Sequence, residues 1–337
     1  MKFNTRKTDA KPAKKPEPKK AENKPKQTPV SSGGKYALPT QILVKEYELT
    51  DLIILLYGEK KIGKTSLAVQ FPDSLFFNCE KGTRGVDCME VDIKDWRDFK
   101  GYLDSLEKAQ KSGELPYKSF AIDTADKLYQ MCFNRVCSDE GMEHPSELSF
   151  GKGWALVNDE FTKQLDRLIA LRKGIVFISH ATEKEYLERG GGKYDKIVPT
   201  MTKQCMAVVN GIADIMIFYG YFGSKRVLSI RGMDSLESGT RMKKNFWVKG
   251  KYEEGQKLIK ELLSKLENET ATEQYLEDTV EKIEKLRVQT IPAGISEEQT
   301  YFNLNLAFKN GQKNNGGKAA GYAPNIEKLA MQQKKNK

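Results

Sequence analysis

The segment GEKKIGKTSLA (residues 58–68) contains residue types that bind phosphate within a short turn. Gly58, Gly63, Lys64 and Thr65 have the spacing G-x-x-x-x-G-K-[ST], in which backbone N–H groups surround an anion and the lysine reaches the β- and γ-phosphates. The segment follows the apolar run LIILLY, as expected of a loop between a buried strand and a helix. A plain strand–turn–helix is the alternative. The spacing favours a nucleoside triphosphate site, ATP being the expected ligand, formed by Gly58, Glu59, Lys60, Lys61, Ile62, Gly63, Lys64, Thr65 and Ser66.

Magnesium accompanies such a triphosphate and prefers oxygen ligands. The Thr65 hydroxyl is one candidate ligand. Asp123 is a second, because it ends the apolar run Phe120–Ile122 and a strand end aims a carboxylate rigidly. The alternative for Asp123 is a turn-forming residue, and Asp126 is a weaker substitute. We therefore expect Mg²⁺ to be bound by Thr65 and Asp123.

Two further polar residues follow apolar strand patterns. Glu80 ends SLFFNCE (residues 74–80) and is the candidate general base, which would orient water against the γ-phosphate. His180 ends GIVFISH (residues 174–180) and could sense the γ-phosphate or relay its presence to the next loop. The alternatives are a solvated strand-end Glu and a buried structural His. With Lys64, these two are the candidate catalytic residues.

Strand and helix patterns alternate along the middle of the chain. Strands are expected at 52–57, 74–80, 89–93, within 117–126 and at 174–180, and amphipathic helices at 96–110 and 153–172. This alternation predicts an α/β fold with a mostly parallel sheet flanked by helices, in which ligands bind beyond the carboxyl ends of the strands. The segments 213–222 and 225–231 predict an antiparallel hairpin at the sheet edge, and 253–288 predicts two helical stretches.

The positive charge of the chain lies at its ends. The 337 residues carry a net charge of +10. Residues 1–35 are Lys- and Pro-rich and residues 309–337 are Lys- and Asn-rich, so the middle of the chain is mildly acidic. Neither end has the apolar periodicity of a folded element, and both are expected to be disordered. They would attract nucleic-acid phosphate by counterion release, or would only aid solubility.

Composition argues against several classes of protein. No apolar run approaches the roughly 20 residues that cross a bilayer. The basic N-terminus is not followed by the apolar segment of a signal peptide. The five Cys lack the spacing of a disulfide framework, and with two His they argue against a zinc site. We therefore expect a cytoplasmic protein with reduced thiols and no membrane partner.

Six segments together resemble the RecA-like P-loop ATPases, most closely the small phage-encoded members associated with single-strand annealing and recombination. In order, they are LIILLYGEKKIGKTSLA, FPDSLFFNCEKGTRGVD, SFAIDTADKLY, FGKGWALVNDEF, GIVFISHATEKEY and GGKYDKIVPTMTKQ, within about residues 38–248. The resemblance implies Glu80 as the water-activating residue, Asp123 as the metal residue and His180 as the γ-phosphate sensor. It also implies the host-cell cytoplasm as the location.

The same resemblance implies single-stranded DNA as a partner, through loops that follow the strands of Asp123 and His180. Segment 138–153 is acidic on balance, so we do not expect it to contact DNA. Segment 183–199 mixes aromatic and basic side chains, which suits base stacking and phosphate contact, with a surface hairpin as the alternative. The candidate DNA-binding residues are Tyr186, Arg189, Lys193, Tyr194 and Lys196.

The family also has a basic cluster that can act across a subunit boundary. Here the corresponding segment is TRMKKNFW (residues 240–247), in which Arg241, Lys243 and Lys244 are candidates and a basic turn is the alternative. The resemblance thus favours a homo-oligomer, either a filament or a ring, and a single-strand-binding protein is a candidate partner.

We therefore expect a RecA-like P-loop ATPase with slow, DNA-stimulated hydrolysis in recombination, annealing or replication. The expected divisions are a disordered basic tail (1–36), the ATPase core (37–250), a helical extension (251–290) and a mostly disordered basic tail (291–337). The alternatives are a non-catalytic, nucleotide-dependent interaction module, a P-loop nucleotide kinase and a motor. A kinase would need an Arg-rich lid, which is not evident near 138–153. A non-catalytic interaction module would lack a water-activating carboxylate, so the presence of Glu80 argues against this alternative.

Overall fold

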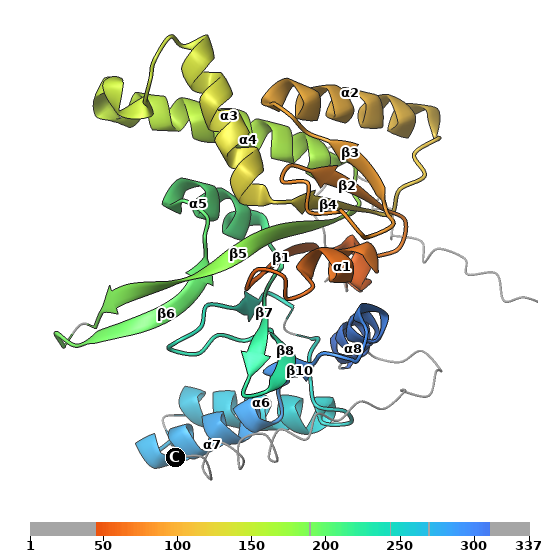
Figure 1. Ribbon diagram of the computed structural model, residues 1–337. Coiled ribbons are helices and arrows are strands. Elements are labelled where there is room, and N and C mark those ends of the chain that lie inside the picture. The colour runs from red at the N-terminus through yellow and green to blue at the C-terminus, as the bar shows by residue number, and fades with distance from the viewer. Residues whose placement is uncertain (1–44, 189, 243, 269, 311–337) are drawn as a thin grey trace, which may run out of the picture. The chain divides into compact units, whose positions relative to one another are not determined.

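A mixed sheet forms the centre of the molecule (Figure 1). The computed structural model describes residues 45–188, 190–242, 244–268 and 270–310, and the described residues from Glu46 onward belong to one compact unit. In spatial order, the strands are β10 (Thr290–Pro292), β8 (Lys225–Ser229), β7 (Ile215–Phe222), β1 (Ile53–Gly58), β5 (Gly174–Leu187), β4 (Ser119–Asp123), β2 (Ser74–Asn78) and β3 (Met89–Asp92). In addition, β6 (Lys193–Pro199) pairs with β5, and β9 (Gly239–Thr240) pairs with β7.

The strands from β7 through β3 are all parallel, whereas β8 is antiparallel to both β7 and β10. The mostly parallel α/β class and the antiparallel hairpin β7–β8 are therefore confirmed. The hairpin lies at the antiparallel edge of the sheet, where a short strand that was not predicted, β10, pairs with the outer side of β8. A three-residue strand such as TIP gives no periodic signal that a sequence reading could detect.

Helices cover both faces of the sheet. The helices are α1 (Lys64–Val69), α2 (Trp96–Ser112), α3 (Ala125–Asp139), α4 (Lys152–Ala170), α5 (Lys203–Ile212), α6 (Tyr252–Glu267), α7 (Glu273–Lys285) and α8 (Glu297–Lys309). Short 3₁₀ helices lie at Leu49–Asp51, Pro145–Glu147 and Ser149–Gly151. Apolar side chains of α2 to α5 pack on one face, those of α1 and α8 pack on the other, and α6 packs against α7.

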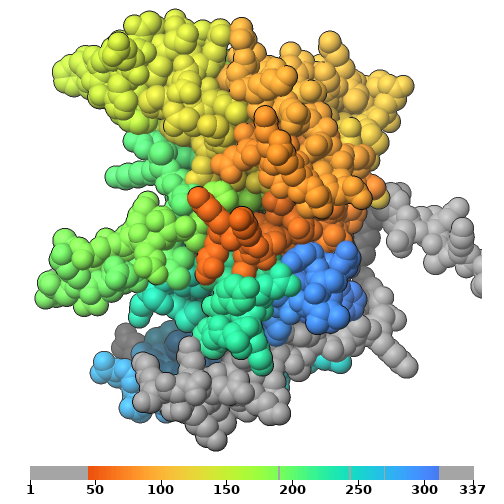
Figure 2. Space-filling model, in the orientation of Figure 1, coloured from red at the N-terminus to blue at the C-terminus, as the bar shows by residue number. Residues whose placement is uncertain are grey.

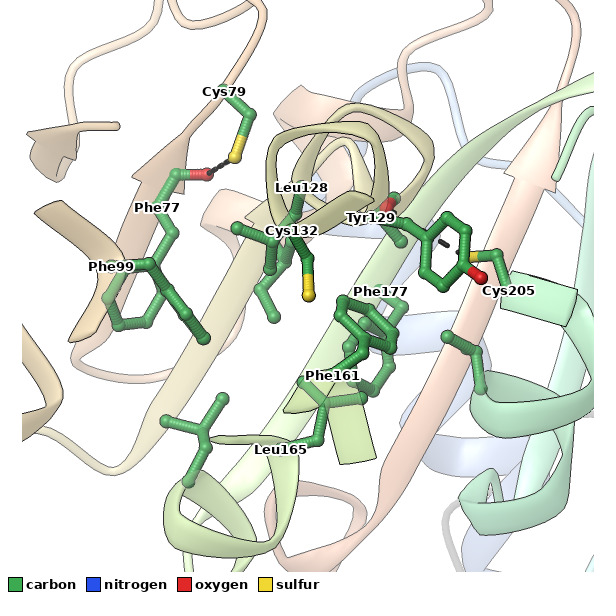
Figure 3. Close-up of a cluster of buried hydrophobic side chains, with 14 of the residues drawn as sticks. Phe77, Cys79, Phe99, Leu128, Tyr129, Cys132, Phe161, Leu165, Phe177 and Cys205 are labelled. Carbon is green, nitrogen blue, oxygen red and sulfur yellow. Dashed lines mark hydrogen bonds between the residues drawn. The ribbon is translucent and has the colours of Figure 1, made fainter. Parts of the chain in front are cut away.

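The core is divided by the sheet, as the alternation of β1 shows. Leu55 and Tyr57 belong to the cluster beneath α2 to α5, whereas Ile54 and Leu56 belong to the cluster beneath α1 and α8. Figure 3 shows the first cluster, in which aromatic rings from the sheet meet side chains of α3 and α4. Because side chains alternate across a strand, a strand buried on both faces reads as a continuous apolar run. This packing fixes the strand ends that carry the polar residues.

The segment expected to be a DNA-facing loop is a two-stranded ribbon. β5 does not end at His180 but continues to Leu187, and its outer half pairs antiparallel with β6 from Ala181 opposite Pro199 to Leu187 opposite Lys193. The ribbon extends away from the sheet (Figure 1). The segment 183–199 is thus a surface hairpin, and DNA binding to it stays a prediction.

The segment 291–310 is ordered, contrary to the expectation of a mostly disordered tail from residue 291. It contains the end of β10 and all of α8, whose Leu304, Ala307 and Phe308 are buried against the sheet. The expected tails at 1–36 and beyond 310 lie outside the described residues. Within the part of the chain that the structure describes, no helix is both long enough and apolar enough to span a bilayer.

Candidate nucleotide site

The turn between β1 and α1 has the shape that its glycines permit. At Gly58 a side chain would collide with the Tyr219 backbone of the neighbouring β7, and Gly63 has φ +111°, which L-residues rarely adopt. Ile62 between them is 5% exposed and packs into the cluster beneath α1. The side chains of Glu59, Lys60 and Lys61 are exposed, and that of Ser66 is half-buried. Gly58 to Thr65 therefore form a tight loop over the carboxyl end of β1.

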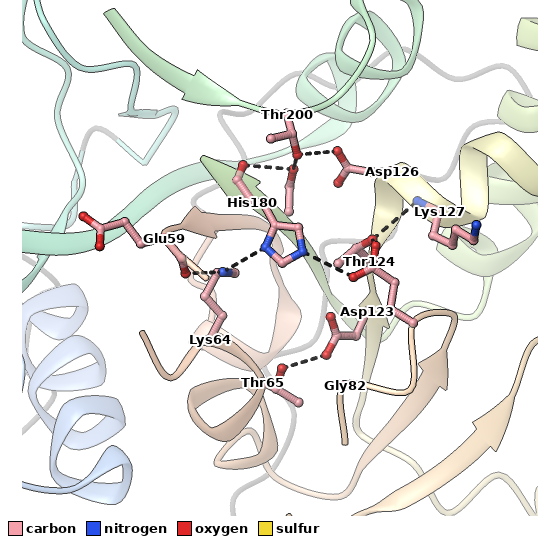
Figure 4. Close-up of polar contacts among 12 residues, drawn as sticks. Glu59, Lys64, Thr65, Gly82, Asp123, Thr124, Asp126, Lys127, His180 and Thr200 are labelled. Carbon is pink, nitrogen blue, oxygen red and sulfur yellow. Dashed lines mark hydrogen bonds and ion pairs between the residues drawn. The ribbon is translucent and has the colours of Figure 1, made fainter. Parts of the chain in front are cut away.

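The Lys64 side chain is folded back onto this loop. Its Nζ donates to the carbonyls of Gly58 at 3.0 Å and Glu59 at 2.6 Å, and it lies 3.4 Å from Nδ1 of His180 (Figure 4). Burial lowers the pKa of Lys64 to about 8, although neighbouring carboxylates oppose this. A bound phosphate would replace the carbonyls as a stronger partner and would favour the charged amine.

Thr65 and Asp123 meet as the sequence predicts. The Thr65 hydroxyl donates to Oδ2 of Asp123 at 2.7 Å, and the Asp123 side chain is almost fully buried, so burial raises its pKa. Gly82 lies against the same carboxylate, where a Cβ would stand 2.8 Å from Oδ2. A hydroxyl and a carboxylate side by side are oxygen donors that suit Mg²⁺. The described residues contain no group of three or more His, Cys, Asp or Glu that could bind a metal by itself, so nucleotide oxygens and water would complete the coordination.

Glu80 lies two residues beyond the end of β2 and is tied to Asp123 through the backbone. Its N–H donates to the Asp123 carbonyl at 3.2 Å. Its Oε1 accepts a hydrogen bond of 2.8 Å from the Thr124 hydroxyl, and its Oε2 lies 3.2 Å from Nε2 of His180. The hydrogen bond with His180 is the main reason that the pKa of Glu80 is below its usual range. Glu80 is therefore an ionised carboxylate beside the phosphate loop.

His180 connects these groups. In the register of the sheet it lies opposite Gly58, at the level where β1 ends. One ring nitrogen faces Lys64 and the other faces Glu80. If Lys64 donates to Nδ1, the neutral ring carries its proton on Nε2 and donates to Glu80. The contact chain Lys64–His180–Glu80 thus joins the start of α1, the middle of β5 and the segment that follows β2.

Sequence reasoning did not identify three hydroxyl residues and one glycine at this site. Thr124 binds Glu80, Gly82 makes room for Asp123, and the Thr200 hydroxyl lies 3.3 Å from that of Ser179. Thr200 also donates to Asp126 Oδ1 at 2.6 Å, which shows that Asp126 pairs with Thr200 instead of Thr65. Ser and Thr beside a helix start are also the ordinary signal of an N-cap, so their pattern alone does not indicate a site.

Arg241, one of the candidate trans-acting residues, lies away from this site. Arg241 follows β9, its N–H donates to the Asp214 carbonyl and its guanidinium donates to the Gly211 carbonyl at 2.6 Å. Asp214 binds the N–H of Ile53, so this region is at the amino end of β1, opposite the phosphate loop. Lys243 lies outside the described residues, and Lys244 is exposed. Arg241 is therefore too far from the nucleotide site of its own chain to act there, and a role in the site of a neighbouring subunit stays a prediction.

The candidate DNA residues divide between the two faces of the ribbon. Tyr186 pairs with Tyr194, and their rings stack with centroids 5.7 Å apart at an interplanar angle of 26°. Lys196 pairs with Lys184, which sequence reasoning did not single out, on the same face as the tyrosines. Lys193 belongs to the opposite face, where it donates to Glu185 at 2.7 Å. Arg189 lies outside the described residues.

A mostly parallel sheet with a phosphate loop after its first strand, a part-buried Thr–Asp pair and an ionised carboxylate defines the class of P-loop nucleotide-binding proteins. Residues 50–242 match the family described as AAA domain, and the chain belongs to that family.

Two named proteins are similar to parts of this chain. The SPbeta prophage-derived uncharacterized protein YorG of Bacillus subtilis (strain 168) is 25% identical over 210 residues, which are 62% of this chain and 59% of that protein. The chain thus spans less than two thirds of the length of that relative. The crystal structure of the KaiC-like protein PH0186 from Pyrococcus horikoshii OT3 aligns with a TM-score of 0.32 and 14% identity, over 56% of this chain and 84% of that one.

Proposed function

We propose that this protein binds ATP with Mg²⁺ and hydrolyses it. The observation that supports this most strongly is the contact chain Lys64–His180–Glu80 beside the Thr65–Asp123 pair. Hydrolysis of a phosphoanhydride needs a cation on the phosphates, a metal site and a group that orients water. The arrangement offers one candidate for each.

Each side chain has a distinct role in this proposal. Lys64 leaves the loop carbonyls and binds the β- and γ-phosphates. Thr65 and Asp123 hold Mg²⁺, which neutralises charge on the phosphates when bound. Glu80 accepts hydrogen bonds from the attacking water and takes its proton, for which its lowered pKa keeps it ionised at neutral pH. His180 senses whether Lys64 is on the loop or on the γ-phosphate, because it contacts both Lys64 and Glu80.

Phosphate release and nucleotide binding, measured on the full chain, test this proposal. Lys64→Ala is expected to abolish ATP binding. Glu80→Gln is expected to bind ATP like the wild type and to turn over at least about a hundredfold more slowly, as loss of a general base does. Glu140→Gln, an exposed helix-cap residue, is the matched control. If the wild type binds ATP but releases no phosphate, the hydrolysis proposal is wrong and the non-catalytic interaction module replaces it.

We further propose that single-stranded DNA binds the ribbon face formed by Lys184, Tyr186, Tyr194 and Lys196. Cross-strand pairing puts the two lysines opposite one another, and the two stacked tyrosines next to them, on one face. The other face has Glu183, Glu185 and Asp195, which would repel phosphate. Stacking rings beside paired cations suit a flexible strand without sequence preference.

Fluorescence anisotropy with a labelled oligo-dT strand at fixed salt tests the DNA proposal. Tyr186→Ala with Tyr194→Ala should weaken binding by tenfold or more, because stacking contributes about 1–3 kcal/mol per base. Leu187→Ala is the control, since Leu187 is 73% exposed on the opposite face. Lys184→Gln should flatten the salt dependence more than Lys193→Gln, which is already paired with Glu185. Equal effects on both faces would contradict the assignment.

The biological setting is part of the same proposal. Because a similar protein is described as prophage-derived, we infer a phage origin and a role in recombination, annealing or replication. A homo-oligomer and a single-strand-binding protein are the proposed protein partners. ATP hydrolysis that is stimulated by DNA would distinguish the proposed ATPase from a nucleotide kinase. A kinase would instead transfer phosphate to a nucleotide acceptor.

A further inference from the structure

The phosphate loop is linked through Arg226 to a part of the chain that lies outside residues 50–242, the span of the AAA domain match. Arg226 of β8 donates from Nη1 to the Ile62 carbonyl at 3.2 Å and to Oε1 of Glu297 at 2.6 Å. Its Nη2 donates to the Gly294 carbonyl at 3.3 Å, just before α8. Figure 2 shows the phosphate loop, the β7–β8 turn and α8 adjoining one another on one face. One guanidinium therefore connects the loop to the start of the C-terminal helix.

The ion pair is held in one geometry. The side chain of Glu297 is 15% exposed and that of Arg226 is 26% exposed. The second oxygen of Glu297 accepts a hydrogen bond of 2.9 Å from the hydroxyl of Tyr219, whose side chain is fully buried. A partly buried pair of this kind contributes little net stability, because desolvation offsets the attraction, so its geometry is the more informative property.

The loop is shaped to fit this pair. The Ile62 side chain is buried, so its carbonyl is presented to Arg226 in a fixed direction. Gly63 follows with φ +111°, and a Cβ there would stand 2.5 Å from Oε1 of Glu297. The backbone conformation at Gly63 therefore favours glycine, and a side chain there would also displace the Glu297 carboxylate from its present position.

We propose that the Arg226–Glu297 pair is a positioning device through which α8 sets the shape of the phosphate loop and its affinity for nucleotide phosphate. The inference rests on the proposed ATP-binding function. Arg226 and Glu297 are positioning residues. They lie on the β7–β8 side of β1, whereas Asp123, Glu80 and His180 come from strands on the other side.

The two residues are not equivalent in this device. Glu297 alone would repel an anion bound at the loop, and Arg226 neutralises it. Loss of Arg226 frees the Ile62 carbonyl and leaves an uncompensated carboxylate beside the phosphates. Loss of Glu297 leaves Arg226 bonded to the loop and adds a free positive charge. Substitution of Arg226 should therefore weaken nucleotide binding more than substitution of Glu297.

Titration of the full chain with a fluorescent ATP analogue and Mg²⁺ tests whether substitution of Arg226 weakens nucleotide binding more than substitution of Glu297. Arg226→Ala should raise the dissociation constant at least about tenfold, Glu297→Ala by no more than about threefold, and Arg226→Lys by an intermediate factor. Wherever turnover is measured, KM should rise while kcat stays within about twofold. Glu298→Gln, at the next and exposed position of α8, is the matched control and should bind like the wild type.

Hydrogen exchange at residues 58–64 without nucleotide separates this inference from the proposed function. Arg226→Ala and Arg226→Lys should exchange faster at these amides than wild type and Glu298→Gln. If the wild type binds no ATP, the proposed function fails, yet faster exchange would still support the positioning role. Unchanged exchange in both Arg226 variants, or a Glu297→Ala effect on affinity larger than that of Arg226→Ala, would overturn it.

Discussion

The buried carboxylate of Asp123 is useful to the candidate site but costs the fold stability. Its side chain is 4% exposed, and burial raises its pKa, so folding disfavours the charge that a Mg²⁺ site needs. The Thr65 hydroxyl and the charge of Lys64 offset part of this cost. A carboxylate kept in such a place is typical of a functional group.

Asp123→Asn is therefore expected to stabilise the nucleotide-free protein while it weakens Mg²⁺-dependent ATP binding. An amide is less costly to bury than a carboxylate and can still accept from Thr65, so the free energy of unfolding at pH 7 should rise by about 1 kcal/mol. Because the raised pKa lets Asp123 protonate as the pH falls, the advantage of Asn should shrink toward pH 5.

Urea unfolding at pH 7 and pH 5 without nucleotide measures this difference. Asp166→Asn, at an exposed position of α4, should change stability by less than about 0.5 kcal/mol at both values. A variant less stable than wild type at pH 7 would show that the Asp123 charge stabilises the fold.

Single residues of the site could be predicted where they end a buried strand or match a spaced motif. Lys64 and Thr65 follow from the phosphate-loop spacing, and Asp123 from the apolar run before it. Thr124 could not be predicted, because it is also the N-cap of α3 and a cap explains it fully. Thr200 could not be predicted either, since its partners Asp126 and Ser179 are far from it in sequence.

Among the elements, the interior strands were predictable, whereas β10 and α8 at one edge of the sheet were not. Strands such as β1 and β4 are buried on both faces and read as continuous apolar runs. In α8, by contrast, the apolar residues are spread around the helix, because it packs on α1 and beside β10. The basic residues that follow α8 also favoured the prediction of a disordered tail.

The packing of α8 gives a prediction at the scale of the element. Phe308 is fully buried on α8, whereas Phe302 on the same helix is 58% exposed. Phe308→Ala should lower the free energy of unfolding by about 3 kcal/mol, through lost burial and the cavity left behind. Phe302→Ala should lower it by less than about 0.5 kcal/mol. Guanidinium unfolding of the two variants measures this, and equal losses would mean that α8 is not part of the folded core.

For the molecule as a whole, the ribbon is joined to the nucleotide site by both of its strands. β5 carries His180 and then continues into the ribbon, while Thr200 follows the end of β6. The Thr200 N–H donates to the His180 carbonyl at 3.0 Å, and its hydroxyl reaches Ser179 and Asp126. A shift of His180 on nucleotide binding would therefore act on both strands at once, which is a physical route between the candidate nucleotide site and the proposed DNA-binding face.

Thr200→Val should break this route without removing either site, because valine keeps the shape and the backbone hydrogen bond but loses the hydroxyl. In the wild type, we expect ATP to change the affinity for oligo-dT by about tenfold, and by linkage oligo-dT must change the affinity for ATP by the same factor. In Thr200→Val, each ligand alone should bind within about twofold of wild type, while both coupling factors should approach one. Thr182→Val, on the ribbon strand β5, is the matched control and should keep the coupling. Full coupling in Thr200→Val would mean that the nucleotide state reaches the ribbon through the backbone of β5 alone.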